Sequence, residues 1–254
     1  MDPDAAYFHP DFGKIRPCQN ALHASDRRKR QAKLSGLSER EIDLRLDDLQ
    51  VIQSDKTFKL PEGEELTRII NGKEKKFNSV YRSNKGMLDT YKRLVSGESD
   101  KPPFFVYVWG PHGGGKTTAA IALVNELNLA GRGDAMYITL PDLLQGLKDS
   151  FDEQNKAQDN RTESQKYQRL QKMPNLVIDE FDFADGKVGH SNYNLQLLQR
   201  LVDHRYRTGK TGETMTTFIS NSPANHIGIA SVVSRLKDSE SFIVLNSAPD
   251  LRQG

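Results

Sequence analysis

The stretch that decides the fold runs Gly110-Pro111-His112-Gly113-Gly114-Gly115-Lys116-Thr117. It follows the apolar run FFVYVW at 104–109 and precedes a predicted helix from Lys116 to about Ala130, which Gly131 ends. The stretch fits the pattern G-x-x-x-x-G-K-[ST] in the strand–loop–helix context that this pattern requires. Glycines let backbone N–H groups turn toward a phosphate without a Cβ clash, and the helix N-terminus adds partial positive charge. The sequence therefore predicts a phosphate-binding loop.

A mainly parallel α/β fold is predicted from the pattern on both sides of this loop. Short apolar runs, each about the length of one buried strand, alternate with stretches of helical periodicity, which is typical of βαβ units. The predicted strands cover residues 104–109, 135–140, 175–178, 216–220 and 241–245, and the predicted helices cover 116–130 and 193–207. We expect a three-layer core built on a five-stranded sheet. The polar stretch 152–165 interrupts it, and we expect a loop or a mobile helix extension there.

A pair of carboxylates ends the third predicted strand. Asp179 and Glu180 follow the apolar run LVI, 63 residues after Lys116. Successive side chains of a strand point to opposite faces, so one carboxylate can reach a metal ion while the next orients a water molecule. Asp179 is the candidate metal-side residue, and Glu180 is the candidate base for an attacking water. Asp182 and Asp185 follow closely and would add negative potential.

The loop and the carboxylate pair together predict ATP and Mg²⁺ as cofactors. Lys116 would bridge the β- and γ-phosphates, and the Thr117 hydroxyl would join the Mg²⁺ shell together with Asp179. Asn221 follows the fourth predicted strand, which we expect between the two motif strands, and would hold the attacking water or the γ-phosphate. The alternative for Asn221 is a helix N-cap, because Pro223 follows closely, as at a helix start.

The composition argues against a membrane-spanning or disulfide-bonded protein. Charged residues make up 28% and hydrophobic residues 36% of the 254, and no apolar run approaches the ~20 residues that a membrane span needs. The N-terminus lacks the basic start and apolar stretch of a secretory signal. Cys18 is the single cysteine, so no intrachain disulfide and no zinc site of several cysteines can form. We expect a cytoplasmic protein.

The first hundred residues alternate in charge and have few long apolar runs, unlike the rest of the chain. The segment VSGESDKPP at 95–103 marks the expected boundary. We therefore expect an N-terminal region, residues 1–100, that binds a partner or DNA, and an ATPase domain, residues 101–254. Ser38 and Glu41 form a capping-box pattern, and apolar residues follow at helical spacing, which predicts a short helix over 38–49.

Basic residues cluster twice in this N-terminal region. Five of the seven residues from Arg27 to Lys33 are basic, and a second cluster, Lys73, Lys75 and Lys76, follows an Asn-Gly turn signal. Both clusters would contact phosphates, or else form ordinary solvated surfaces. The aromatic residues Tyr81, Tyr91 and Tyr167 are compatible with stacking on nucleic-acid bases.

The chain resembles the AAA+ ATPases, and within them the DnaC/IstB group of helicase loaders and transposition helper ATPases. The resemblance rests on GPHGGGKTT at 110–118, LVIDEFDFAD at 176–185, LVDHRYR at 201–207, TTFISN at 216–221 and VVSRL at 232–236. It implies a P-loop AAA+ core without the C-terminal helical lid that most AAA+ proteins carry, and the 33 residues after Asn221 agree with this. Relatives carry paired cysteines where Cys18 and His23 stand alone, so zinc is not expected.

The resemblance also implies roles for individual residues. Arg235 falls at the family's arginine finger, a cation that enters a neighbouring subunit's ATP site and contributes ~10³–10⁵ in rate. Arg205 matches the arginine of the family's Arg-Tyr pair and would face a neighbour's nucleotide. The alternative for both is a surface arginine in a salt bridge. The expected nucleotide-binding residues are Gly110, Pro111, His112, Gly113, Gly114, Gly115, Lys116, Thr117, Thr118, Asp179 and Arg205, the expected catalytic residues are Lys116, Glu180, Asn221 and Arg235, and the expected metal ligands are Thr117 and Asp179. Arg252 would align with a terminal arginine of the group, although the residues around it differ.

The function that the resemblance implies is an ATP-dependent helicase loader in DNA replication. Such a protein associates with itself through the ATP site, binds single-stranded DNA in a salt-sensitive and sequence-independent way, and hands a ring helicase onto it. The alternative within the group is a transposition helper that coats duplex DNA and recruits a transposase. Two other classes stay open. One is a metabolic P-loop kinase, which the adjacent Asp179 and Glu180 disfavour, and the other is an adaptor that binds ATP without hydrolysing it.

Overall fold

Five parallel strands form the centre of the protein, whose structure is a computed structural model that describes residues 29–70, 73–98, 102–148, 163–182 and 192–252. Across the sheet the order is β6 (Ala135–Thr139), β7 (Asn175–Asp179), β8 (Met215–Ser220), β5 (Phe105–Trp109) and β9 (Ser241–Leu245). All neighbouring strands pair in parallel. The five predicted strands are confirmed, and β8 lies between β7 and β5, the strands that precede the carboxylate pair and the loop.

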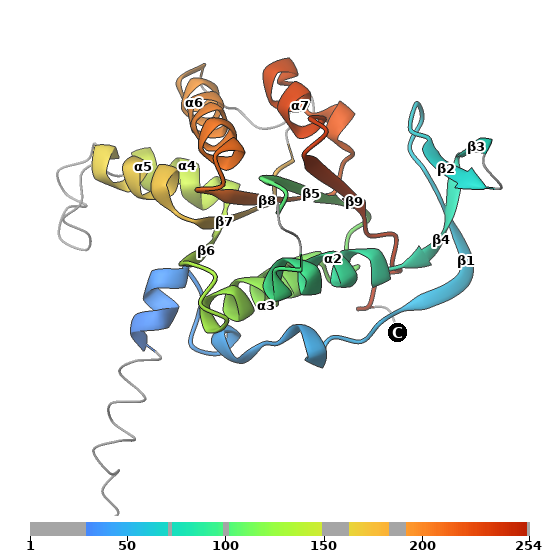
Figure 1. Cartoon of the computed structure of the whole chain (residues 1–254), viewed down its shortest axis with the longest axis horizontal. Helices are drawn as coiled ribbons and strands as arrows, with labels where there is room; N and C mark the ends of the chain where they lie inside the picture. Colours follow the sequence, from blue (N-terminus) through green and yellow to red (C-terminus); the bar gives the residue numbers. More distant parts are fainter. Residues whose placement is uncertain (1–28, 71–72, 99–101, 149–162, 183–191, 253–254) are drawn as a thin grey trace, which may run out of the picture.

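Helices cover both faces of this sheet (Figure 1). On one face lie α2 (Lys85–Ser96) and α3 (Lys116–Leu129), and on the other lie α4 (Leu140–Lys148), α5 (Glu163–Lys172), α6 (Asn192–Lys210) and α7 (Ala230–Leu236). The strands are almost continuously apolar because helices bury both of their faces. The predicted three-layer α/β core is confirmed.

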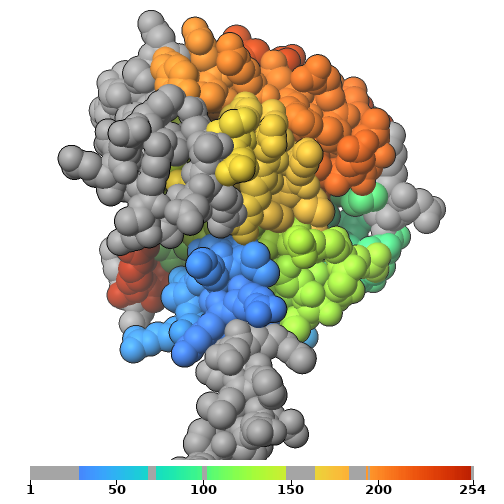
Figure 2. Space-filling view, turned by 90° about the vertical axis from the view of Figure 1, so that its left-hand side faces the viewer, coloured from blue at the N-terminus to red at the C-terminus, as the bar shows by residue number. Residues whose placement is uncertain are grey.

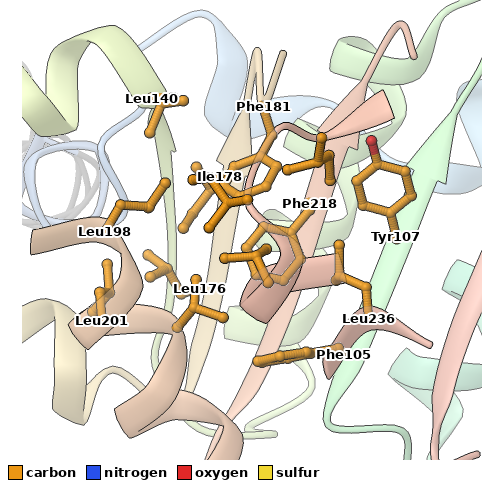
Figure 3. Packing of buried hydrophobic residues seen from close by; sticks show 14 of the residues in the cluster. Phe105, Tyr107, Leu140, Leu176, Ile178, Phe181, Leu198, Leu201, Phe218 and Leu236 are labelled. Atoms are coloured by element: carbon orange, nitrogen blue, oxygen red, sulfur yellow. The ribbon is translucent and has the colours of Figure 1, made fainter. Parts of the chain in front are cut away.

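The core between the sheet and α6 combines leucines with a group of packed aromatic rings (Figure 3). Phe218 of β8 lies with its ring centroid 5.2 Å from Phe105 of β5 and 4.6 Å from Phe181. Leu198 and Leu201 of α6 belong to the same cluster and lie on the side of Leu176 and Ile178. Burial of each such side chain stabilises the fold by about 1.5–3 kcal/mol. Because Phe181 directly follows Asp179 and Glu180, this packing anchors the segment that carries the carboxylates.

The N-terminal segment packs along α3 rather than forming the helix predicted over 38–49. Residues 29–35 are helical, and two short 3₁₀ turns follow, η1 (Glu41–Asp43) and η2 (Leu46–Asp48). The buried Asn125 of α3 donates from Nδ2 to the carbonyl oxygens of Glu41 at 2.7 Å and Leu44 at 3.0 Å. The prediction of a helix was wrong because α3 takes up backbone carbonyls that a continuous helix would use.

The same N-terminal segment also reaches α5, whose yellow surface lies directly beside the blue residues in Figure 2. Arg169 of α5 donates from Nη2 to the carbonyl oxygen of Leu34 at 2.8 Å. Gly36 lies so close to the carbonyl oxygen of Tyr137 on β6 that a Cβ atom would collide with it. The segment therefore covers the β6 side of the core.

Two small antiparallel sheets stand beside the core near β9 (Figure 1). One pairs β1 (Gln53–Lys59) with β4 (Ser79–Ser83), and the other pairs β2 (Leu66–Ile70) with β3 (Lys73–Phe77). The second basic cluster lies exposed on β3.

The three tyrosines expected to stack on bases differ in exposure. Tyr81 of β4 is 71% exposed, whereas Tyr91 is fully buried under the sheet. Tyr167 is half-buried and donates its hydroxyl to the carbonyl oxygen of Leu197 at 3.1 Å. Tyr91 therefore cannot stack on a nucleic acid, which corrects that expectation.

Several predictions fall on residues outside the described ranges. They concern Cys18, His23, Arg27, Asp185, the Asn71-Gly72 turn and most of the polar stretch, residues 152–162. Within the described ranges, no helix is both long and apolar enough to cross a membrane.

Candidate functional site

A cleft of about 600 Å³ opens at the carboxyl ends of β5, β7 and β8. This edge is where parallel α/β sheets bind their ligands. The predicted residues that line it are His112, Gly113, Gly114, Gly115, Lys116, Thr117, Thr118, Asp179, Glu180 and Asn221. Asp182 and Arg252, which the sequence also singled out, line it too, and the structure adds Pro141, Ile219, Ser220 and Leu251. The structure thus brings the loop, the carboxylate pair and Asn221 together.

The loop has the backbone shape that a phosphate cradle needs. Gly113 and Gly115 have φ angles of 75° and 78°, in the left-handed region that favours glycine. α3 begins at Lys116 directly after the loop, so its free N–H groups and its positive dipole end open into the cleft. Gly110 does not line the cleft, but a Cβ atom there would collide with the carbonyl oxygen of Asn246. This geometry fits a bound phosphate chain.

Lys116 is a buried cation held by uncharged oxygens. Its Nζ donates to the carbonyl oxygens of Gly110 at 2.8 Å and Pro111 at 2.7 Å, and to Oδ1 of Asn221 at 3.0 Å. Burial lowers the pKa of Lys116 to about 8, against the opposing effect of nearby Asp179. A phosphate oxygen is a stronger acceptor than a carbonyl, because a charged partner strengthens the hydrogen bond. Lys116 is therefore placed to exchange these contacts for a phosphate.

Asp179 is buried, and both of its oxygens are already oriented. Oδ1 accepts the backbone N–H of Glu180 at 2.7 Å, and Oδ2 accepts the hydroxyl of Tyr137 at 2.9 Å. Burial and the Asp179 carboxylate raise the pKa of Tyr137 above its usual range, so this hydroxyl remains a donor. Sequence reasoning missed Tyr137, which stands two residues before the end of β6.

Glu180 is exposed in the cleft and has an unusual backbone. Its φ is 55°, and among the described residues it is the single non-glycine residue with a positive φ. Such a conformation costs about 1–3 kcal/mol and persists where the surroundings impose it. Glu180 nevertheless lines the cleft and is exposed there, where a base for the attacking water must stand.

Asn221 is fixed by a neighbouring carboxylate. Asp182 accepts from the Asn221 backbone N–H at 2.7 Å through Oδ1 and from its Nδ2 at 2.7 Å through Oδ2. Ser220 also donates its hydroxyl to Asp182 Oδ1 at 2.6 Å. The alternative of a helix cap is wrong, because the next turn, η4 (Ala224–His226), has Pro223 at its N-cap and no side-chain cap.

The segment after β9, residues 246–252, closes one side of the loop. Asn246 is fully buried, and its Nδ2 donates to the carbonyl oxygen of Gly114 at 2.7 Å while its Oδ1 accepts the N–H of Ala248 at 3.0 Å. The N–H of Leu251 reaches the carbonyl oxygen of Gly113 at 3.1 Å. Sequence reasoning missed this role, although Asn246 directly follows a strand in the same way as Asn221.

Arg205 does not reach the cleft, which corrects the expectation of a nucleotide contact. Its side chain is 1% exposed, and its guanidinium donates to the carbonyl oxygens of Leu170, Met173 and Met215 at 2.7, 2.8 and 2.7 Å. Burial lowers its pKa to about 9. The residue joins the end of α5 to the start of β8, and no side-chain atom is left to face a neighbour.

Arg235 lies on α7, outside its own cleft. Its Nη2 lies 2.9 Å from Oδ1 of Asp203, its Nη1 donates to the carbonyl oxygen of Ser231 at 2.7 Å, and its guanidinium lies 5.6 Å from the ring centre of Tyr206. The salt bridge of the alternative interpretation is present. A role toward a neighbouring subunit remains a prediction.

A metal ion would be held jointly with a ligand at this site. Among the residues that the structure describes, no group of three or more His, Cys, Asp or Glu side chains could hold a metal. Thr117 and Asp179 both line the cleft, and oxygen donors of this kind suit Mg²⁺ completed by phosphate oxygens and water.

The sequence matches the family model described as "ATPase family associated with various cellular activities (AAA)" over residues 106–238. No curated protein matches the chain.

Solved structures of similar fold include the DnaC helicase loader, DnaI and a DNA replication initiation factor. The crystal structure of the DnaC helicase loader is 16% identical with a TM-score of 0.53, covering 82% of this chain and 99% of that one. The crystal structure of DnaI is 16% identical with a TM-score of 0.53, covering 87% and 98%. A DNA replication initiation factor is 17% identical with a TM-score of 0.51, covering 64% of this chain, which spans 45% of that structure. At these identities the likeness shows the fold.

Proposed function

Because the chain belongs to the family of ATPases associated with various cellular activities (AAA), we propose that it hydrolyses ATP in this cleft and acts as a helicase loader in DNA replication. The observation that carries the proposal is the meeting of Lys116, Asp179 and Asn221 at one edge of the sheet, around a loop shaped for phosphates. A glycine-rich turn without a ligand would not need a buried lysine beside a buried carboxylate.

ATP with Mg²⁺ supplies a terminal phosphoryl group whose transfer to water is the reaction. The loop N–H groups and the start of α3 bind the phosphates, and Lys116 neutralises charge on them. Thr117 and Asp179 would hold the metal ion. Glu180 stands free in the cleft to polarise the attacking water, and Asn221 helps to place that water. The protein thus contributes position and charge, which is what phosphoryl transfer requires.

The helicase-loader part of the proposal rests on the motif resemblance and on the similarity in fold to the DnaC loader, whose chain this one covers almost completely. Single-stranded DNA and a ring helicase are the proposed partners, and self-association through the ATP site completes the assembly. We assign the partner and DNA contacts to residues 1–100. Exposed lysines on β3, with Tyr81 on β4, offer charge for phosphates and a ring for stacking.

The test uses the full chain, because described residues of the N-terminal region pack against α3 and α5. We expect the chain to co-elute with a hexameric replicative helicase and single-stranded DNA when a non-hydrolysable ATP analogue is present. DNA affinity should fall steeply between low and physiological salt, since phosphate contacts release counterions.

The matched control is Lys116→Ala, which should bind the nucleotide more weakly and retain correspondingly less of the complex. Failure to retain any replicative helicase contradicts the loader proposal. Coating of duplex DNA with retention of a transposase would assign the chain to transposition helpers instead. Rapid phosphorylation of a metabolite would assign it to kinases.

A further inference from the structure

Asp182 lies in the cleft but takes no part in the reaction proposed above. The preceding residue, Phe181, is fully buried against Phe218 and anchors this part of the backbone. Its two oxygens accept three hydrogen bonds, from the Ser220 hydroxyl and from the backbone and side-chain N–H groups of Asn221. A carboxylate with this many fixed donors has one orientation.

These contacts decide which way the Asn221 amide faces. A carboxylate only accepts hydrogen bonds, so the amide atom that lies 2.7 Å from Asp182 Oδ2 must be the nitrogen. The amide oxygen then points the other way, where it lies 3.0 Å from Nζ of Lys116. The ammonium group only donates, so the second contact requires the same orientation independently.

We propose that Asp182 is a positioning residue that locks the Asn221 amide with its oxygen toward the cleft, so that Asn221 accepts a hydrogen bond from the attacking water and does not donate one to the γ-phosphate. The proposal rests on the ATP hydrolysis proposed above and specifies how its water is held. In the nucleotide-free chain the same oxygen holds Lys116, and it becomes free for the water once Lys116 turns to the phosphates.

The two possible orientations of the amide act on different steps. A donor nitrogen would bind a γ-phosphate oxygen in the ground state, so it would contribute to ATP affinity over ADP affinity. An acceptor oxygen takes one hydrogen of the water while Glu180 takes the other, which directs a lone pair of the water oxygen at phosphorus. The acceptor therefore contributes to kcat and not to ATP affinity.

The substitution Asp182→Asn tests this role. An asparagine at this position keeps the shape but donates as well as accepts, so the Asn221 amide is free to turn its nitrogen into the cleft. We expect kcat to fall about tenfold or more while KM does not rise. Removing this negative charge near the phosphates would tighten ATP binding. A disrupted cleft would weaken ATP binding instead, so KM distinguishes the two effects. A variant with wild-type kcat, or one in which kcat falls only together with a weaker ADP affinity, overturns the proposal.

The matched control is Asp134→Asn, which removes the charge of an exposed carboxylate outside the cleft and outside residues 1–100. It should leave kcat, KM and thermal unfolding unchanged. Thermal unfolding of Asp182→Asn shows whether that variant is folded at the assay temperature.

A second measurement does not depend on hydrolysis. In the wild-type chain, the side-chain NH₂ group of Asn221 faces Asp182, so NMR should detect no ¹⁵N–³¹P coupling across a hydrogen bond between that group and a bound non-hydrolysable ATP analogue. In Asp182→Asn such a coupling should appear. A ¹⁵N–³¹P coupling at Asn221 in the wild-type chain overturns the proposal. If the wild-type chain shows no ATP turnover, this contradicts the proposed function itself.

Discussion

Lys116 shows how burial sets the chemistry of a single residue. Its pKa of about 8 means that part of the population is uncharged in the nucleotide-free chain at slightly alkaline pH. Bound phosphates favour the ammonium form, so the pKa in the complex is higher than in the free chain. Nucleotide binding above pH 8 must then take up a proton.

The first prediction follows from this linkage. We expect the affinity for ADP to fall as pH rises above about 8, by up to tenfold per pH unit while the free lysine is neutral and the bound one is charged. Calorimetric titrations at a series of pH values measure the slope. The Lys116→Met variant should bind more weakly and show a flat profile over the same range. Equal slopes in the two proteins would show that another group is responsible.

Arg205 is the residue whose role could not be predicted from the sequence. Helical periodicity places it near the end of α6, but the three carbonyl oxygens that it binds come from α5, from Met173 directly after α5 and from β8, segments whose approach only the fold reveals. The position of Asn221 in the cleft was predictable, because the carboxyl ends of parallel strands meet at one edge.

The second prediction separates a structural from a catalytic role for Arg205. Arg205→Lys keeps the charge but loses the planar fork, so several buried carbonyl oxygens lose their donors, and we expect a loss of about 2 kcal/mol or more in the free energy of unfolding. The nucleotide affinity of the folded variant should stay within about twofold of wild type. Urea titration and calorimetry measure the two quantities. A fall in nucleotide affinity without a loss of stability would restore the site role.

At the scale of elements, the segment 246–252 connects the loop to the small β1–β4 sheet. Ser247 donates its hydroxyl to the carbonyl oxygen of Tyr81 at 2.8 Å and accepts the N–H of Ser83 at 3.0 Å, while Asn246 holds Gly114. The loop is thus supported from a part of the chain more than a hundred residues away. Its sequence motif alone does not reveal this support.

The third prediction concerns that support. Asn246→Ala removes the donor to the Gly114 carbonyl and the acceptor for the Ala248 N–H, both buried, and we expect a loss of about 1–3 kcal/mol in the free energy of unfolding. ADP affinity should fall as well, because the loop loses its fixed shape. The control is Asn225→Ala, which removes only an exposed contact to Glu64. If both variants behave alike, the segment does not position the loop.

At the scale of the whole molecule, the five strands and the layers could be predicted because periodicity and strand length report directly on burial. The helix predicted over 38–49 is absent, since Asn125 and Glu126 of α3 compete for the backbone groups of that segment, with Leu46 N–H donating to the Glu126 carboxylate at 2.8 Å. Local propensity therefore gave way to tertiary contacts at the point where a distant helix offered partners.

The remaining question at this scale is whether one chain holds a complete site. Arg235 lies outside its own cleft and forms a salt bridge with Asp203. If it takes part in hydrolysis, it must therefore act in the cleft of a second copy of the chain. A site completed by a neighbour makes hydrolysis depend on assembly. Two inactive variants then become useful, because each retains the half that the other lacks.

The fourth prediction is complementation between these halves. Glu180→Gln and Arg235→Ala should each lose turnover by about 10²-fold or more while still binding ATP. In an equimolar mixture, a Glu180→Gln subunit can offer Arg235 to the intact cleft of an Arg235→Ala subunit, and random assembly should recover about one quarter of the wild-type rate. The rate is measured at fixed total protein, with Arg207→Ala, an exposed arginine on α6, as the control that keeps full activity alone. If the mixture is no faster than the average of the two variants, Arg235 does not act between subunits, and its salt bridge with Asp203 is its whole role.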